Sequence, residues 1–233
     1  MTLFMNKNRV SSALWVSFIA VATLMSCSSS QETAMVPVNA PEVAPLAEAV
    51  VPSPDPRVGL DAGLFDAEEA LWNLEVLSQT PPPEKFIGKT NSDLAFKGNY
   101  AFQGNYNGVI VWDISDPANP VLVNDYECPA SQSDVSVYGN LLFVSGEGLE
   151  GRIDCGTEGV REAVSEVRLR GIRIFDITDI QNPEYVANVQ TCRGSHTHSV
   201  LKDPNDNENI YVYVSGSYVV RPDEELPGCS DLQ

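Results

Sequence analysis

Short runs of alternating apolar and polar residues fill the chain from Asn91 onward, and one run occurs twice. Gly108–Val121 reads GVIVWDISDPANPV, and Gly171–Glu184 reads GIRIFDITDIQNPE. Each copy is a series of β-branched and aromatic residues that stops at an Asp. Turn-forming residues follow, because Asp side chains bond nearby backbone N–H groups and Pro fixes φ. The pattern therefore predicts a strand, a tight turn and a second strand in each copy.

The repeat extends upstream of these runs. Residues 92–104 align with residues 133–146, which begin 41 positions later, and the two segments turn at Gly98-Asn99 and Gly139-Asn140, as hairpins do. A unit therefore has four strands, which the first unit places at Asp93–Lys97, Asn99–Gln103, Val109–Ile114 and Val121–Glu127. A third unit begins at His198–Leu201 and continues at Ile210–Ser215.

Four strands in roughly 40–45 residues is the period of a β-propeller blade. The sequence therefore predicts an all-β fold, a β-propeller of four-stranded antiparallel blades, of which about two and a half are present. Because propellers typically close with roughly four to eight blades, we expect further units after Gln233.

The repeated motif, a glycine, a hydrophobic run, an aromatic residue and Asp-Ile-Ser/Thr-Asp, resembles the LVIVD-repeat β-propeller family of bacterial surface lipoproteins. The resemblance covers residues 91 to about 217. Trp112 and Phe175 stand where that family has an aliphatic residue before the Asp. The resemblance implies the propeller fold, and it brings no common activity with it.

Residues 1–26 have the pattern of a lipoprotein signal peptide. Two basic residues precede the apolar run Ala13–Met25, which is too short to span a membrane, and Leu24-Met25-Ser26-Cys27 resembles a bacterial lipobox. We therefore expect a lipid anchor on Cys27 and export to the cell envelope. Ser28, and not an Asp, directly follows Cys27, which by resemblance to Gram-negative lipoproteins favours the outer membrane, facing the periplasm or the cell surface. An ordinary secretory signal is the alternative.

Two segments separate Cys27 from the repeats. Residues 27–60 are rich in Ser, Pro and Ala, which predicts a flexible, disordered tether. Residues 61–90 are expected to contain a short amphipathic helix at Asp61–Leu77, with acids near its start, and then a Pro-rich connector. The blades occupy residues 91–233. The helix is expected to pack on the outside of the propeller, or to bind a partner.

The chain is acidic, with a formal net charge of −18. Such a surface repels nucleic acid and anionic lipid headgroups, so no nucleic-acid partner is expected. Ten charged residues lie in an insert, residues 147–170, between the second and third strands of the second unit. Because long ordered loops on a scaffold often carry function, we expect this insert to form a recognition rim.

Four cysteines remain besides Cys27, and they allow three pairings. Cys128 and Cys192 both end the fourth strand of a unit, whereas Cys155 and Cys229 both follow a second strand. These connections emerge on one side of a four-stranded antiparallel blade, so the repeat favours Cys128–Cys155 and Cys192–Cys229. A thiolate metal site is the alternative, although no Cys-x-x-Cys spacing occurs.

Asp93, Asp134 and His198 are expected at equivalent positions, where the innermost strands begin. There they would form part of a ring at one mouth of the channel. His196 lies two residues before His198, so both imidazoles would point the same way, and imidazole with carboxylate suits Zn or Cu. The alternative is that the two aspartates cap backbone N–H groups and lock adjacent blades.

No Gly-x-Ser-x-Gly, phosphate-loop or His-Glu-x-x-His motif occurs. The absence of these motifs weakens a hydrolase or NTPase interpretation and leaves an unfamiliar site open, so we favour a membrane-anchored binding or scaffold module over an enzyme. Its protein or small-molecule ligand would contact the loop face that carries the disulfides. The alternative function is a periplasmic or surface metalloenzyme with Zn or Cu on His196 and His198.

Overall fold

The computed structural model describes residue 50, residues 52–64 and residues 66–229. The chain divides into two units between Asp55 and Pro56. The expected signal peptide, the lipid anchor on Cys27 and most of the tether lie outside the described residues. Within those residues, no helix combines the length and apolar character needed to cross a membrane.

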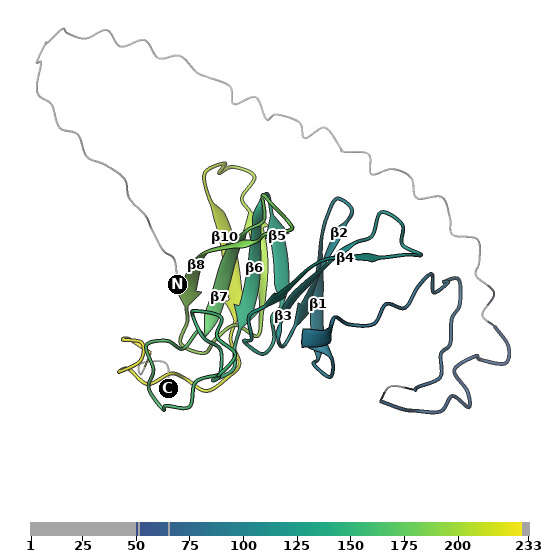
Figure 1. Ribbon diagram of the computed structural model, residues 1–233, viewed down its shortest axis with the longest axis horizontal. Helices are drawn as coiled ribbons and strands as arrows, with labels where there is room; N and C mark the ends of the chain where they lie inside the picture. Colours follow the sequence, from purple (N-terminus) through teal and green to yellow (C-terminus); the bar gives the residue numbers. More distant parts are fainter. Residues whose placement is uncertain (1–49, 51, 65, 230–233) are drawn as a thin grey trace, which may run out of the picture. The chain divides into compact units, whose positions relative to one another are not determined.

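The described residues of the second unit form three antiparallel sheets (Figure 1). Sheet 1 contains β1 (Asn91–Lys97), β2 (Tyr100–Asn105), β3 (Gly108–Asp113) and β4 (Val121–Glu127) in that order. Sheet 2 contains β5 (Val135–Tyr138), β6 (Leu141–Gly146), β7 (Gly171–Asp176) and β8 (Glu184–Gln190). A hairpin contains β9 (Thr197–Lys202) and β10 (Ile210–Ser215). The all-β fold with four-stranded antiparallel units is confirmed.

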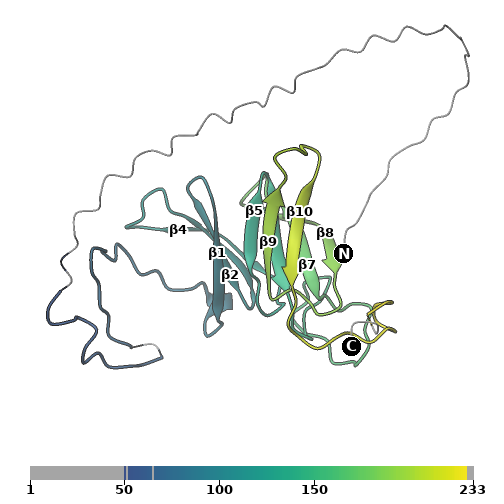
Figure 2. The same ribbon diagram turned by 180° about the vertical axis from the view of Figure 1, so that it is seen from behind.

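Neighbouring sheets pack through their faces, with β1 next to β5 and β5 next to β9 (Figure 2). The core between sheets 1 and 2 contains Phe102, Val109 and Val111 of sheet 1, and Val135, Leu142, Val144 and Phe175 of sheet 2. This is how propeller blades pack. The described sheets are consistent with part of a propeller, and they form no closed ring.

The glycine that opens each copy of the motif is required by the strand beside it. Gly108 and Gly171 have φ values of 144° and 148°. A Cβ atom would lie 2.1 Å from the Tyr126 carbonyl oxygen at Gly108, and 1.9 Å from the Val189 carbonyl oxygen at Gly171. Only glycine fits at these two positions, which explains why the motif begins with it.

The prediction of an amphipathic helix at Asp61–Leu77 is wrong. The described residues of this segment are irregular, and the short 3-10 helix η1 (Glu84–Phe86) follows it. Leu64 and Leu74 are exposed, so these leucines do not pack against the described part of the chain as the apolar face of a helix would. An isolated helix of this length is marginal in water without such packing.

The strand pairings correct the equivalence that the sequence suggested. The pairs are Leu94 with Gln103, Val135 with Val144, and His198 with Val214. Leu94, Val135 and His198 are therefore equivalent, and His198 stands at an apolar position of the repeat. The expected equivalence between His198 and the two aspartates is wrong by one residue, because Thr197 is the residue that matches them.

One disulfide joins each four-stranded sheet to a loop of the next unit. Cys128–Cys155 links the end of sheet 1 to the insert, and Cys192–Cys229 links the end of sheet 2 to the segment after β10. The pairing favoured by the repeat is confirmed. Such bonds persist in an oxidising, extracytoplasmic environment.

Reduction of the disulfides is expected to lower the free energy of unfolding. They close loops with sequence separations of 27 and 37 residues, and each is expected to contribute about 3 kcal/mol by restricting the unfolded chain. Urea denaturation with and without dithiothreitol measures the loss, with peptide mapping under non-reducing conditions as the control on pairing. An unchanged midpoint after complete reduction would contradict this expectation.

Candidate functional site

The two aspartates of the predicted site join neighbouring sheets. Asp93 Oδ2 accepts a hydrogen bond from the backbone N–H of Val135 at 3.1 Å, and Asp134 Oδ2 accepts one from His198 N–H at 2.9 Å. Asp93 in β1 thus reaches β5, and Asp134, directly before β5, reaches β9. Both aspartates take the capping role that the sequence offered as the alternative to ligand binding.

His198 is a buried connection between sheet 2 and the hairpin. Its Nδ1 lies 3.0 Å from Asp134 Oδ2 and 2.9 Å from Ser145 Oγ. Ser145 Oγ in turn lies 2.7 Å from Ser195 Oγ. The His198 side chain is fully buried, and its Nε2 has no hydrogen-bond partner among the described residues. The imidazole therefore fills a core position with one nitrogen satisfied.

The residue types Ser, His and Asp meet at this point without the geometry of a catalytic triad. In a triad the carboxylate and the nucleophilic hydroxyl contact different nitrogens of the imidazole. Here Asp134 and Ser145 both contact Nδ1 of His198. The arrangement therefore does not activate Ser145 as a nucleophile.

His196 forms the second histidine–carboxylate pair and is open to solvent. Its Nδ1 lies 2.8 Å from Glu147 Oε2, and its side chain is 44% exposed. An ionised carboxylate only accepts hydrogen bonds, so Nδ1 carries a proton, and in the neutral imidazole Nε2 then has a free lone pair. Ser217 holds the other carboxylate oxygen, because its N–H and its hydroxyl each donate to Glu147 Oε1 at 2.8 Å.

Both carboxylates of these pairs remain ionised at neutral pH. Burial would raise the pKa of Glu147, but hydrogen bonds from Ser217 and His196 outweigh it and hold that pKa below its usual value. Burial acts on Asp134 in the same direction, and hydrogen bonds from His198 again leave its pKa lowered. The two negative charges therefore fix the orientation of both imidazoles.

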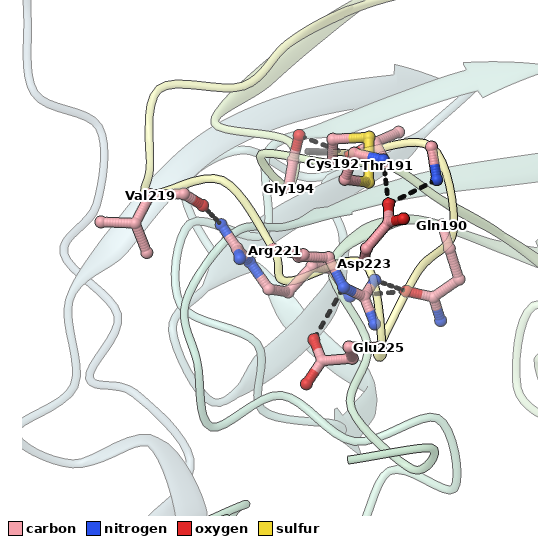
Figure 3. Close-up of a disulfide and its surroundings, with 11 residues drawn as sticks. Gln190, Thr191, Cys192, Gly194, Val219, Arg221, Asp223 and Glu225 are labelled. Atoms are coloured by element: carbon pink, nitrogen blue, oxygen red, sulfur yellow. Dashed lines mark hydrogen bonds and ion pairs between the residues drawn. A yellow bond between two sulfur atoms is a disulfide. The ribbon is translucent and has the colours of Figure 1, made fainter. Parts of the chain in front are cut away.

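A buried ion cluster braces the loops around His196. Arg221 donates to Glu225 Oε1 at 2.7 Å and to Gln190 Oε1 at 2.6 Å, beside the Cys192–Cys229 disulfide (Figure 3). Arg168 of the insert also pairs with Glu225, and both partners are almost fully buried. Glu225 therefore ties the insert to the segment that follows β10. This set of loops, residues 147–170 and 216–229, is called the rim below.

Arg170 places the backbone on both sides of the Glu147–His196 pair. It donates to the Glu147 carbonyl oxygen at 3.0 Å and to the Val219 carbonyl oxygen at 2.6 Å. Its guanidinium lies 5.4 Å from the ring centre of Tyr218, which suits a cation–π contact. Burial, and then the charge of Arg221, lower the pKa of Arg170.

Arg173 of β7 has a similar role at the other disulfide. It donates to the carbonyl oxygens of Cys128, Pro129 and Arg152. Burial lowers the pKa of Arg173 to about 10, so it stays charged at neutral pH. No pattern in the sequence separates Arg170 or Arg173 from the other charged residues, because their partners lie 21 to 49 positions away.

The structure divides the predicted site residues between two places. Asp134 contacts His198, and Asp93 reaches across from sheet 1 to the backbone of Val135 beside Asp134, whereas His196 pairs with Glu147. Among the residues that the structure describes, no three His, Cys, Asp or Glu side chains gather as a metal-binding group. Sequence reasoning missed Glu147 as a site residue, and its one signal was its place directly after Gly146, where the insert begins.

Comparison with known proteins supports the repeat. Residues 88–128, which contain all of sheet 1, match the LVIVD repeat family model. No curated protein matches the chain. Among solved structures, the computationally designed Ika4 protein is similar over 62% of this chain and 100% of its own, with 17% identity and a TM-score of 0.28. The LVIVD repeat suggested by the motif is therefore confirmed for the first unit.

Replacement of Asp134 is expected to make the free energy of unfolding depend less on pH in the acidic range. Its folded-state pKa is lowered, so its stabilising effect is present above about pH 4, the unfolded value, and is lost as pH falls through the folded pKa. Asp134→Asn should lower the free energy of unfolding by about 1–2 kcal/mol at pH 7, and the variant should lose less stability on acidification than the wild type. Urea denaturation from pH 7 to pH 3 measures both effects.

The matched control is Glu166→Gln, which removes an exposed carboxylate of the insert. This variant should keep the profile of the wild type. If Asp134→Asn and the wild type lose the same stability on acidification, the carboxylate does not join the sheets in the charged form.

Proposed function

We propose that this chain is a lipid-anchored, extracytoplasmic repeat module that binds a ligand where sheet 2 meets the hairpin. The observation that carries the proposal is the Glu147–His196 pair, an oriented and half-exposed imidazole on a braced rim. Confirmed disulfide pairing supports export, and the predicted signal peptide supports anchoring through Cys27 in the outer membrane. The acidic charge argues against nucleic acid as the ligand.

His196 departs from the repeat in a way that the fold does not require. In the corrected register, His196 occupies the position that Ser92 and Ser133 occupy in the first two units. Those serines donate to backbone carbonyl oxygens, Ser92 to Ser133 and Ser133 to Ser131. In the third unit an imidazole replaces the hydroxyl, and its Nε2 makes no hydrogen bond with the described residues. A nitrogen that the fold leaves free supports a role in recognition.

The chemistry of the site indicates the kind of ligand. In the neutral imidazole Nε2 of His196 accepts a hydrogen bond, which suits a ligand that offers an N–H or O–H group. Tyr218 and Val219 are exposed on the segment that directly follows Ser217. An accepting nitrogen beside aromatic and aliphatic surface suits a small polar molecule with an apolar part, or a protein side chain of that type.

A metalloenzyme with Zn or Cu at this mouth is the second candidate. One observation favours it, because histidines that bind metal usually donate their other N–H to a carboxylate, as His196 does to Glu147. The described residues supply one accessible imidazole, so further ligands would have to come from the substrate, from water or from another chain. This requirement makes the binding module the better supported proposal.

The lipid anchor is tested by metabolic labelling. Cells given a radiolabelled fatty acid should label the wild-type chain, because the thiol of Cys27 is the expected acceptor, and should not label Cys27→Ala. Fractionation of the same cells shows whether the labelled chain is in the outer membrane. Equal labelling of both chains would rule out Cys27 as the anchor.

The binding role is tested by protection of His196 from diethyl pyrocarbonate, followed by mass spectrometry. His196 should react and the buried His198 should not. Small molecules extracted from the cell envelope should protect His196, and EDTA should leave this protection intact. His196→Ser, which restores the residue of the other units, is the control for nonspecific labelling.

Protection by ZnCl₂ or CuCl₂ alone, reversed by EDTA, would support the metal candidate instead. If neither extract nor metal protects His196, this site does not bind the proposed ligand.

A further inference from the structure

A short loop, residues 191–196, joins β8 to β9 and carries His196 at its end. Its backbone is fixed at both ends. His196 N–H donates to the Ser215 carbonyl oxygen at 2.8 Å, and Arg221 N–H donates to the Cys192 carbonyl oxygen at 2.8 Å. Cys192 is also one half of a disulfide. The residues between these two points are therefore held beside the Glu147–His196 pair in one arrangement.

Arg193 lies within this loop and has an unused side chain. It is exposed, and its side chain makes no hydrogen bond or ion pair with the described residues. A Cβ atom added to Gly216 would lie 3.0 Å from the Cβ of Arg193, so the two residues are adjacent. Ser217, which follows Gly216, donates to Glu147, and Glu147 orients His196. A guanidinium with five donors therefore begins next to the site, and no side chain at Gly216 separates it from Ser217.

The charged groups buried around the site have an excess of positive charge. Arg168 and Arg221 share the carboxylate of Glu225, and Arg170 is held by two backbone carbonyl oxygens. Glu147 supplies the second negative charge, so three arginines face two glutamates. The chain as a whole is strongly acidic, with a formal net charge of −18. A local excess of positive charge in such a chain favours an anion at this point and disfavours a cation.

We propose that the site binds a small hydroxycarboxylate, whose carboxylate pairs with Arg193 and whose hydroxyl donates to Nε2 of His196. The proposal rests on the proposed function and names the chemical class of its ligand. A guanidinium binds a carboxylate through two parallel N–H···O bonds, so one arginine balances one monoanion. A phosphate ester carries more charge and would need further donors. An ammonium group in place of the hydroxyl would be repelled by the local positive charge.

Arg193 is a specificity-determining residue in this arrangement, and its replacement should not disturb the fold. Its side chain has no partner among the described residues, so Arg193→Gln should leave the loop, the disulfide and His196 in place. Lys202→Gln is the matched control. It also removes one exposed positive charge, but at the far end of β9 from His196.

The experiment divides the small molecules extracted from the cell envelope on an anion-exchange resin at neutral pH. Each fraction is tested for protection of His196 from diethyl pyrocarbonate, read by mass spectrometry. The retained fraction, which contains the acids, should protect the wild type and Lys202→Gln equally. Arg193→Gln should need about tenfold more of this fraction for the same protection, because one charged, hydrogen-bonded pair is lost.

Two chemical treatments of the retained fraction test the ligand class. Alkaline phosphatase should leave the protection unchanged, whereas acetylation of hydroxyl groups with acetic anhydride should abolish it. Protection that phosphatase removes would indicate a phosphate ester, and protection that survives acetylation would show that no hydroxyl is needed. Either result would overturn the assignment of a hydroxycarboxylate.

The fractions also separate failure of this proposal from failure of the binding role. Protection by the unretained fraction alone, which contains neutral molecules, cations and zwitterions, would overturn the ligand class and leave the binding role standing. Equal protection of Arg193→Gln and the wild type by the retained fraction would overturn the role of Arg193. If no fraction protects His196, the binding role itself fails. Labelling of His196 in each variant without extract confirms that the residue is still accessible.

Discussion

The contact between neighbouring sheets is the interaction on which the rest of this structure depends. A four-stranded antiparallel sheet has two faces, and here the largest set of buried side chains lies between sheets 1 and 2. Asp93 and Asp134 add a charge-assisted hydrogen bond at the same edge of each interface, which fixes how far one first strand sits along the next. The disulfides then fasten the loops at this edge, so the repeat sets the positions of both the core and the rim.

The third unit shows where the repeat gives way. The first two units read Ser-Asp-Leu and Ser-Asp-Val, and the third reads His-Thr-His. His198 replaces an apolar residue and is accommodated by Asp134 and Ser145, so it is explained by packing. His196 is not explained in this way, because its pairing with Glu147 orients a nitrogen, Nε2, that makes no hydrogen bond with the described part of the chain. The two histidines look alike in the sequence, and only burial separates the structural one from the candidate binding residue.

Alternation and symmetry made most of the fold predictable. The strands Val121–Glu127 and Ile210–Ser215 have the expected bounds, and the disulfide pairing followed from equivalent positions in the repeat. The helix at 61–77 failed because amphipathic spacing stabilises a helix only where a surface receives it. The sequence-based alignment of His198 with Asp93 and Asp134 was wrong by one residue. Thr197 occupies the equivalent position, but it lacks the carboxylate by which that position is recognised in the first two units. The roles of Glu147 and Arg170 could not be predicted from the sequence, because their partners are distant in the sequence.

The rim buries a cluster of charged side chains. Burying Arg168, Arg221 and Glu225 is costly, and replacing such a cluster with apolar residues often leaves a protein equally stable or more stable. What the cluster provides is geometry, because Glu225 can pair with both arginines only when the insert and the segment after β10 meet in one arrangement. That arrangement holds Ser217 against Glu147, and Glu147 holds His196. Under the proposed binding role, a rim that is ordered beforehand would lose little conformational entropy on binding, so the stability given up to bury these charges would lower the entropic cost of recognition.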